Sequence, residues 1–148
     1  MNMQKWRSEV ISNRVKKGMP VLSFPSTQLM GVTVLELLNS SDFQAKGMKM
    51  IADRCDEGIA AGMMDLSVEA EAFGCSVVFA DNEVPRAEAL GIKDLDECNG
   101  LVVPHVGAGR TGKDIEGIAK AKALITDRPV IANVIGPYSL AGNIMDVS

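Results

Sequence analysis

Three carboxylates lie close together in the segment MMDLSVEAEAFGC, residues 63–75, and could do acid–base or binding chemistry. Asp65 follows the run GIAAGMM, whose small apolar residues are typical of a buried parallel strand, and barrel enzymes draw catalytic groups from the carboxyl ends of such strands. A helix that begins directly after the aspartate would place Asp65 and Glu69 on one face, and Glu71 would point away. The same residues also suit a helix N-cap followed by a solvated first turn, so spacing alone leaves both interpretations open.

A second segment, GAGRTGKD, begins at Gly107 and partly matches a phosphate-binding loop. Gly107, Gly112 and Lys113 have the spacing of G-x-x-x-x-G-K-[ST], and they follow the apolar run LVVPHV, a candidate strand. Asp114 replaces the hydroxyl residue that this motif needs for magnesium, and its carboxylate would repel nucleotide phosphates. Thr111 and Asp114 suit a capping box, and the residues after them have helical apolar spacing. We therefore predict a capped helix that starts near Gly112, with anion binding by its first amide groups as the alternative.

Cysteine and histidine spacing does not indicate a metal site. Cys55, Cys75 and Cys98 are far apart in sequence, which favours reduced thiols over a disulfide framework or a C-x-x-C metal site. His105 is the only histidine, and a zinc site would have to combine it with distant cysteines. We interpret His105 as a structural residue and predict no metal ligands in this chain.

The elements that must position these residues are predicted from periodicity and from turn signals. Helices are expected where apolar residues recur at helical spacing, at residues 4–17, 32–38, 40–55, 67–73, from 112 onwards and from 138 onwards. Ser41 and Gln44 suit a capping box for the third of these helices. Short apolar runs predict buried strands at residues 21–24, 58–65 and 129–137. Residues 75–89 resemble a β-hairpin with its turn at Asp81 and Asn82, and Pro85 limits the second strand to a sheet edge.

Strands that alternate with helices of this length indicate an α/β class with a parallel sheet. We predict one structural unit over residues 1–148, because no repeat, linker or low-complexity tract divides the chain. About three strands of the parallel type are present, whereas a closed (β/α)₈ barrel takes eight. The pattern therefore predicts part of a barrel, with the hairpin as an insertion.

Composition excludes several classes of protein. An apolar content of 47% and a charged content of 23% are those of a globular protein. The net charge of −4, with scattered basic residues, argues against nucleic acid as a partner. No apolar run reaches the length of a membrane span, and the first residues lack the apolar core of a signal peptide. We therefore expect a cytoplasmic protein without membrane contacts.

Four segments together resemble a known superfamily. FPSTQLMG (24–31), MMDLSVEAEAFGC, VGAGRTGKDIEGI and DRPVIANVIGPYSLAG (127–142) look like the uroporphyrinogen decarboxylase superfamily, and they are most similar to its corrinoid-dependent methyltransferase branch. The resemblance covers nearly the whole chain but only the N-terminal portion of a family member. It implies a (β/α)₈ TIM barrel with an active site at the C-terminal mouth of the strands.

Residue matches separate the two branches of the superfamily. Asp65 matches the aspartate with which the decarboxylases hold the pyrrole nitrogens of their substrate. Pro25 and Leu29 stand where those enzymes have arginines that bind substrate carboxylates, and the catalytic tyrosine falls near Asn143. A pocket for a substrate with eight carboxylates would lose strong charged hydrogen bonds without those arginines. The resemblance thus favours methyl transfer and keeps tetrapyrrole decarboxylation as the alternative.

The methyltransferase branch implies transfer of a methyl group from a methylcobamide, carried on a partner corrinoid protein, to a thiol such as coenzyme M or to another acceptor. Zinc, held by one His and two Cys in the C-terminal half of family members, would activate the thiol. Those ligands are absent here. The chain would contribute Asp65, Glu69 and Glu71 as catalytic groups and Ser139 and Asn143 as substrate-binding groups.

Two further expectations follow from an incomplete barrel. The chain alone should be inactive, and its open sheet edges should favour self-association. The remaining hypothesis, from a different class, is a non-enzymatic α/β binding module that uses the loop from Gly107 to Lys113 for an anion.

Overall fold

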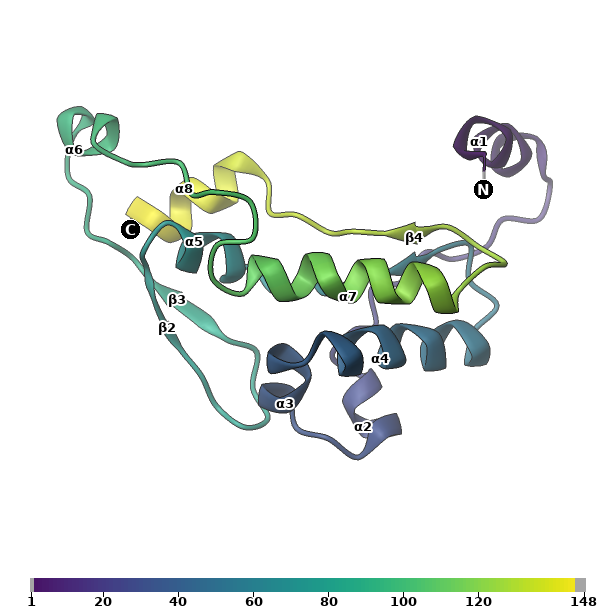
Figure 1. The fold of residues 1–148 in the computed structure, drawn as a ribbon. Coiled ribbons are helices and arrows are strands. Elements are labelled where there is room, and N and C mark those ends of the chain that lie inside the picture. Colours follow the sequence, from purple (N-terminus) through teal and green to yellow (C-terminus); the bar gives the residue numbers. More distant parts are fainter. Residues whose placement is uncertain (1, 146–148) are drawn as a thin grey trace.

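The computed structural model describes residues 2–145, and within them the chain is an α/β protein with a parallel and an antiparallel strand pair (Figure 1). The α/β class and the parallel strands predicted from the sequence are confirmed. In chain order the elements are α1 (Met3–Ser12), α2 (Ser26–Met30), α3 (Val34–Asn39), α4 (Ser41–Arg54), β1 (Ala60–Ala61), α5 (Val68–Ala72), β2 (Ser76–Val78), β3 (Arg86–Glu88), α6 (Leu95–Asn99), α7 (Thr111–Leu124), β4 (Val130–Ile131) and α8 (Pro137–Met145).

Strands β1 and β4 form the parallel pair, with Ala60 opposite Val130 and Ala61 opposite Ile131. The long connection between them contains α7, which packs beside α4, and the two helices contact β4 and β1 respectively (Figure 1). Parallel strands joined through a helix form a βα unit of the kind that the sequence pattern predicted. The carboxyl ends of both strands consequently point towards the same end of the molecule, where α5 and α8 lie.

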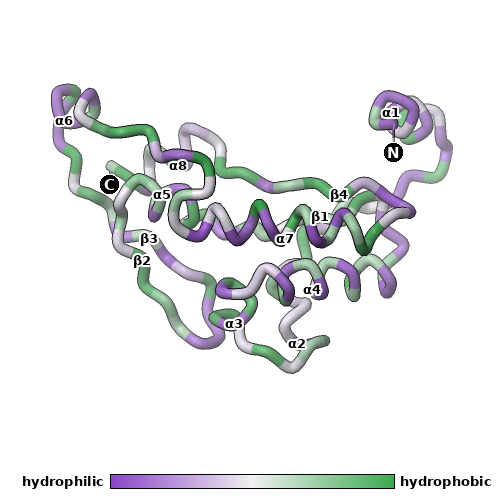
Figure 2. Tube along the Cα trace, viewed as in Figure 1, coloured by the Kyte–Doolittle hydropathy of each residue, from purple (hydrophilic) through white to green (hydrophobic). Residues whose placement is uncertain are grey.

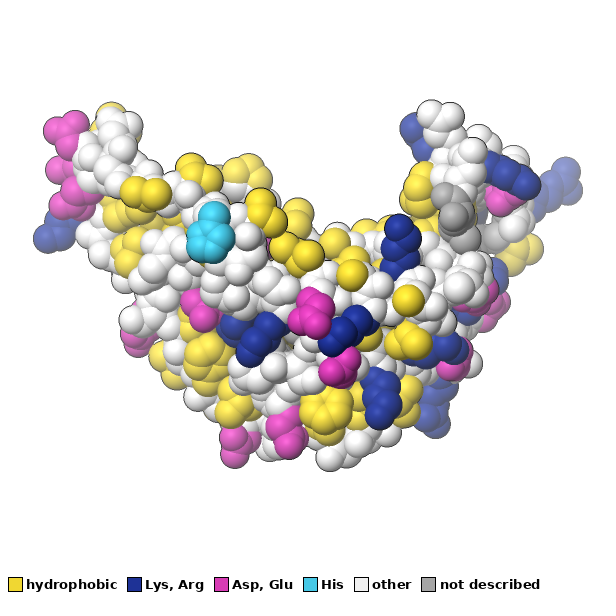
Figure 3. Space-filling view, in the orientation of Figure 1, with side chains coloured by type: hydrophobic (Ala, Val, Ile, Leu, Met, Phe, Trp, Pro, Cys, Tyr) yellow, Lys and Arg dark blue, Asp and Glu magenta, His cyan; other side chains and the backbone are white. Residues whose placement is uncertain are grey.

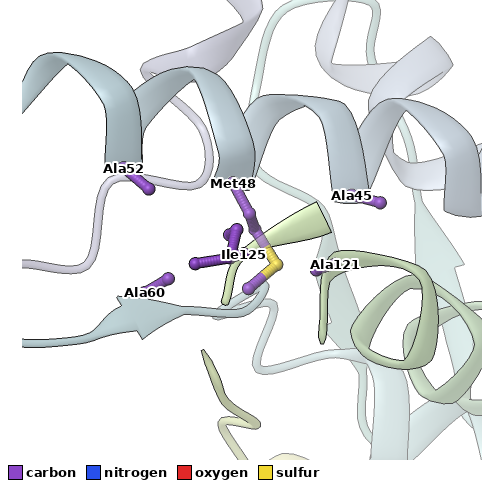
Figure 4. Close-up of a cluster of buried hydrophobic side chains, with 6 residues drawn as sticks. All are labelled: Ala45, Met48, Ala52, Ala60, Ala121 and Ile125. Carbon is purple, nitrogen blue, oxygen red and sulfur yellow. The ribbon is translucent and has the colours of Figure 1, made fainter. Parts of the chain in front are cut away.

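Small side chains build the core between α4, α7 and the strand pair. The buried cluster consists of Ala45, Met48, Ala52, Ala60, Ala121 and Ile125 (Figure 4). Gly117 lies at the same helix contact, and a Cβ atom at this position would approach Gln44 Oε1 to 2.4 Å. Apolar residues alternate with polar ones along both helices, as expected of helices with one buried face (Figure 2). The close approach holds the first turn of α7 beside α5.

Two predicted strands are not formed. Residues 21–24 lead into a turn instead, because the carbonyls of Ser23 and Phe24 accept hydrogen bonds from the backbone N–H groups of Ser26 and Thr27 at the start of α2. The run LVVPHV has no regular structure, and the side chains of Val102, Val103 and Val106 are exposed. A strand needs a neighbour for its backbone groups, so an apolar run alone does not make one.

Helix capping also differs from the prediction. Ser40, and not Ser41, caps α4, because its Oγ accepts a hydrogen bond from the backbone N–H of Phe43 at 3.2 Å. The expected box between Thr111 and Asp114 is absent, although a helix does start at Thr111. The Thr111 hydroxyl donates to the carbonyl of Ala108 at 2.5 Å instead. Gln44 and Asp114 were expected to close these boxes at their own helix ends. Instead Gln44 donates a hydrogen bond to Asp114 across the contact of α4 with α7, so tertiary packing overrides the local cap.

Strands β2 and β3 pair antiparallel, with Ser76 opposite Glu88 and Val78 opposite Arg86. Their connection spans residues 79–85, so it is longer than a tight turn at Asp81 and Asn82. That this pair is an insertion in a barrel stays a prediction. Helix α1 ends at Ser12 rather than near residue 17, and α6 was not predicted. Among the described residues, no helix has both the length and the apolar character needed to cross a membrane.

Candidate functional site

Arg110 occupies the centre of a buried polar cluster at the carboxyl end of β1. It is the last residue before α7, and its side chain is only 7% exposed. The guanidinium donates from Nη1 to Asp65 Oδ2, from Nε to Glu71 Oε2 at 2.5 Å and from Nη2 to Ser67 Oγ at 2.8 Å. It also lies over the ring of Phe79, 4.9 Å from the centroid. Three acceptors from the segment after β1 therefore share one cation from the loop before α7, and we call these four residues, Asp65, Ser67, Glu71 and Arg110, the Arg110 cluster.

Asp65 is fully enclosed in the Arg110 cluster, with a side chain that is 0% exposed. Its second carboxylate oxygen accepts from the backbone N–H of Ser67 at 2.9 Å and from the Ser67 hydroxyl at 2.6 Å. An aspartate followed two residues later by serine can form this local turn, which explains why the chain bends here before α5 begins at Val68. The strand predicted over residues 58–65 spans only Ala60–Ala61, so Asp65 lies four residues beyond the strand end, and its facing an active site stays a prediction.

Ion pairing compensates for the burial of Arg110. Burial by itself would lower the pKa of the guanidinium, but hydrogen bonds and charge from Asp65 and Glu71 raise it above its ordinary value.

The predicted orientation of the two glutamates is wrong in one respect. Glu71, expected to point away, joins Asp65 through Arg110, because α5 begins only at Val68 and the turn before it changes the helical phase.

Glu69 instead links the ends of the two parallel strands. Its Oε1 accepts a hydrogen bond from the backbone N–H of Ile135, after β4, at 3.2 Å. Asn133 donates to the carbonyl of Gly62 at 2.9 Å, and Asn143 of α8 donates to the carbonyl of Leu66 at 2.8 Å. These three bonds tie the segment after β1 to the segment after β4. Asn143 thus lies next to the loop that carries Asp65, whereas Ser139 is exposed in the first turn of α8.

Asp114 adds a third carboxylate near the same guanidinium, although the sequence suggested for it only a capping role. It accepts a hydrogen bond from Gln44 Nε2 at 2.9 Å. The pKa of Asp114 is raised to about 6, mainly by burial and also by the charge of Asp65, although the hydrogen bond from Gln44 and the charge of Arg110 lower it. A carboxyl group with this pKa exchanges its proton near neutral pH. It is therefore the described group at this end that is best suited to acid–base exchange.

The glycine-rich loop has a structural explanation. Gly107 and Gly109 have positive φ angles of 86° and 55°, and a Cβ atom on Gly112 would approach the Gly107 carbonyl oxygen to 2.9 Å. Lys113 Nζ donates to Asn39 Oδ1 at 3.3 Å. The glycines therefore allow the chain to fold back tightly and to present Arg110 to Asp65.

The described residues contain no group of three or more His, Cys, Asp or Glu side chains that could hold a metal ion. His105 is exposed on the segment before the glycine-rich loop, Cys55 lies at the end of α4 and Cys75 is buried beside Ile144. Within residues 2–145 these side chains do not form a group of ligands, so the donor set described there does not fit a zinc ion.

Arg110 is the residue of the candidate site that sequence reasoning missed. The signal was present, because GAGRTGKD places a long cation, Arg110, between the flexible glycines and the helix start at Thr111. Comparison with the P-loop motif drew attention to Lys113 instead. Only the tertiary contact between the loop and α5 identifies Arg110 as the group that pairs with the carboxylates.

Comparison with protein families gives a match along most of the chain. The family model described as "Uroporphyrinogen decarboxylase (URO-D)" matches residues 19–148. The matched range contains the Arg110 cluster and both parallel strands.

Two similar proteins come from Methanosarcina mazei. The chain is 31% identical over 86 residues to "Methylcobamide:CoM methyltransferase MtbA", a match that covers 54% of this chain and 24% of that protein. A solved structure of a "methyltransferase from Methanosarcina mazei" is 22% identical, with a TM-score of 0.76, and the match covers 95% of this chain and 44% of that one. The fold is therefore shared over almost all of this chain, which spans less than half the length of either protein.

Proposed function

The chain belongs to the uroporphyrinogen decarboxylase family, and from that premise we propose that it forms part of a methyltransferase active site. The reaction would move a methyl group from a methylated corrinoid protein to a thiol of the coenzyme M kind. The similar protein named as a methylcobamide:CoM methyltransferase supports this choice within the family. The chain would supply the N-terminal portion of a (β/α)₈ barrel.

The observation that carries the proposal is the place of the Arg110 cluster. Asp65 follows β1. Ile135 and Asn133, which bond to Glu69 and Gly62, follow β4, so all of these contacts lie at the carboxyl ends of the parallel pair. In barrel enzymes this end carries the active site. The role that the contacts support best is positioning: Arg110 holds Asp65 and Glu71 in fixed orientations, which keeps one wall of the site rigid.

Asp114 is the group in this chain that would take up or release a proton. Its pKa of about 6 keeps both protonation states accessible near neutral pH, and Gln44 orients the carboxyl group. We propose that residues 2–145 supply no zinc ligand. In the complete enzyme, zinc would bind through other residues and supply thiol activation.

Decarboxylation of a tetrapyrrole remains the second candidate, because the family model carries that description. Its substrate carboxylates would need free cations at the mouth. Arg110 is already engaged by Asp65, Glu71 and Ser67 and is almost fully buried, so it is not available to a substrate carboxylate. Pro25 and Leu29, which lie at α2, supply no charge.

Exposed apolar residues around the same end support a requirement for further protein. Val106, Tyr138 and Val134 are 90%, 87% and 76% exposed. In Figure 3 hydrophobic side chains gather on the upper surface, over α8 and the segment that leads into α7. Within residues 2–145 no further strand pairs with the outer edges of β1 and β4. We propose that the rest of a barrel, or a second copy of the chain, covers this surface.

Three measurements test these proposals. The protein encoded by the complete reading frame is incubated with methylcobalamin and coenzyme M, and methyl transfer is followed by the loss of methylcobalamin absorbance; the 148-residue chain is assayed in parallel and should be inactive. Uroporphyrinogen is offered as the competing substrate, and its turnover without any methyl transfer would establish the second candidate.

Sedimentation of the 148-residue chain over a range of concentrations should show self-association, and a monodisperse monomer would contradict the exposed-surface proposal.

A further inference from the structure

A second polar site lies at the opposite end of β1, where Glu57 precedes the strand. Glu57 is 5% exposed, and neither carboxylate oxygen has a hydrogen-bond partner within residues 2–145. The same is true of the hydroxyl of Ser23, and both residues line a small space of about 10 Å³, about the size of one water molecule. A buried carboxylate without a partner is costly, so the site calls for a group that can compensate it.

Glu57 also lines a much larger cavity of about 430 Å³. Its walls come from α1, from the segment that follows α1, and from the residues just before β1 and β4; Trp6, Val10, Val15 and Met19 supply apolar surface. Figure 3 shows the surface hollowed beside α1, the arm at the upper right. A cavity of this volume is large enough for a small organic molecule.

Among the described residues that line this cavity, Glu57 is the carboxylate without a hydrogen bond or ion pair to its oxygens, because Glu9 pairs with Lys5 at 3.9 Å and Asp127 pairs with Arg128. Lys16 Nζ donates to the carbonyls of Val10 and Ile11 at the end of α1, and Lys17 pairs with Asp56. Arg128 pairs with Asp127 through Nη2 at 2.8 Å, and its Nη1 donates to backbone carbonyls, including that of Glu57 at 3.3 Å. The cations are thus already engaged, and an anionic ligand would find no free partner.

We propose that the cavity binds a small organic ammonium ion, with Glu57 as the acceptor of its cationic head and Trp6 and the apolar walls as the surface for its hydrocarbon part. An ammonium group donates several hydrogen bonds and supplies the positive charge that would pair with Glu57. The indole ring of Trp6 adds a favourable cation–π contact. Both carboxylate oxygens are enclosed in the free chain. Because Glu57 lines both spaces, binding would turn its side chain towards the larger one. The cavity lies at the end of the strands opposite the Arg110 cluster, so this proposal does not depend on the proposed methyl transfer.

The chain offers a direct readout, because Trp6 is its only tryptophan. Trp6 fluorescence is titrated with n-butylammonium chloride at pH 8, and potassium chloride at equal ionic strength serves as the reference. We expect a saturable change with butylammonium only. Glu57→Gln should weaken the apparent affinity by about tenfold or more, since it removes a charged hydrogen bond. Asp53→Asn removes an exposed carboxylate outside the cavity and should leave the affinity within about twofold.

Three results would overturn the proposal: no saturable change, the same change with potassium, or unaltered binding by a folded Glu57→Gln variant. If circular dichroism shows that this variant does not fold, the test moves to the unmodified chain. Burial raises the pKa of Glu57, against the opposing charge of Arg128, so the carboxylate should protonate as the pH falls. Stabilisation by butylammonium against thermal unfolding should therefore be larger at pH 8 than at pH 4, which lies below the ordinary pKa of a glutamate, and equal stabilisation at both values would reject Glu57 as the acceptor.

Discussion

The two ends of strand β1 carry buried carboxylates in opposite situations. Asp65, after the strand, receives hydrogen bonds from Arg110 and from Ser67 on both of its oxygens. Glu57, before the strand, is equally buried, but its oxygens have no hydrogen-bond partner within residues 2–145. The same chain therefore satisfies one buried charge completely and leaves the other open.

The difference shows what each end is built for. A charge that is fully paired by its own chain is held in one geometry and contributes rigidity, at the cost of removing both ions from water. An unpaired buried carboxylate must gain a proton, a ligand or another cation. The first arrangement suits a wall of an active site, and the second suits a binding site for a group from outside the chain.

The largest expected effect comes from removing the cation at the paired end. Arg110→Ala would leave the buried Asp65 and the half-buried Glu71 without their cation, and we expect a loss of about 3–5 kcal/mol in the free energy of unfolding. Urea denaturation measures this loss. Lys113→Ala, in the first turn of α7, removes a half-buried cation that donates only one long hydrogen bond, to Asn39; it is the control and should change stability by about 1 kcal/mol or less. Equal effects of the two variants would show that the Arg110 cluster does not hold the fold together.

Asp114 tests how far one guanidinium can compensate the surrounding carboxylates. Its pKa is raised to about 6 by burial, so the folded chain holds this proton more tightly than the unfolded chain does. Asp114 should therefore lower stability as the pH rises from about 4 to above 6. Asp114→Asn keeps an oxygen acceptor for Gln44 and removes the charge. We expect a gain of about 2 kcal/mol at pH 8 and little gain at pH 4, measured by urea denaturation at both values.

Glu57→Gln examines the open end in the same way. Without amines in the buffer, the variant removes an unpaired buried charge, and we expect a gain of about 1 kcal/mol at pH 8. Since the pKa of Glu57 is raised, the residue is neutralised more readily in the folded chain, and the gain should shrink as the pH falls. A loss of stability at pH 8 would mean that Glu57 already has a cationic partner.

The contrast between the two ends could be predicted from sequence only in part. Asp65 was identified because a polar residue that ends a small apolar run is a local pattern. Arg110 was not, because its pairing with Asp65 depends on the approach of α7 to α5, which no local spacing encodes. Glu57 gave no signal at all. Its burial arises where the chain before β1 passes the residues before β4, far away in sequence.

Secondary structure shows the same division. Helices α4 and α7 have strong periodicity and were found where expected, whereas the strands at residues 21–24 and in LVVPHV were not. A helix satisfies its own backbone groups, but a strand needs a neighbour. The caps failed for a related reason, because Gln44 and Asp114 were used for contact between helices instead of for their own helix ends.

The smallest expected effect separates a structural role of Asn143 from a binding role. Asn143 donates to the carbonyl of Leu66 at 2.8 Å, so it supports the loop that carries Asp65 through a neutral bond. Asn143→Ala should lower the free energy of unfolding by about 0.5–1 kcal/mol, which urea denaturation can resolve. Ser139→Ala changes an exposed position four residues earlier in the same helix and should leave the free energy of unfolding unchanged. If both variants are as stable as the parent chain but weaken methyl transfer by the complete protein, the two side chains bind substrate. A stability loss confined to Asn143→Ala would instead show a structural role. The loop that carries Asp65 would then be held by charged hydrogen bonds from Arg110, before α7, and by a neutral hydrogen bond from α8.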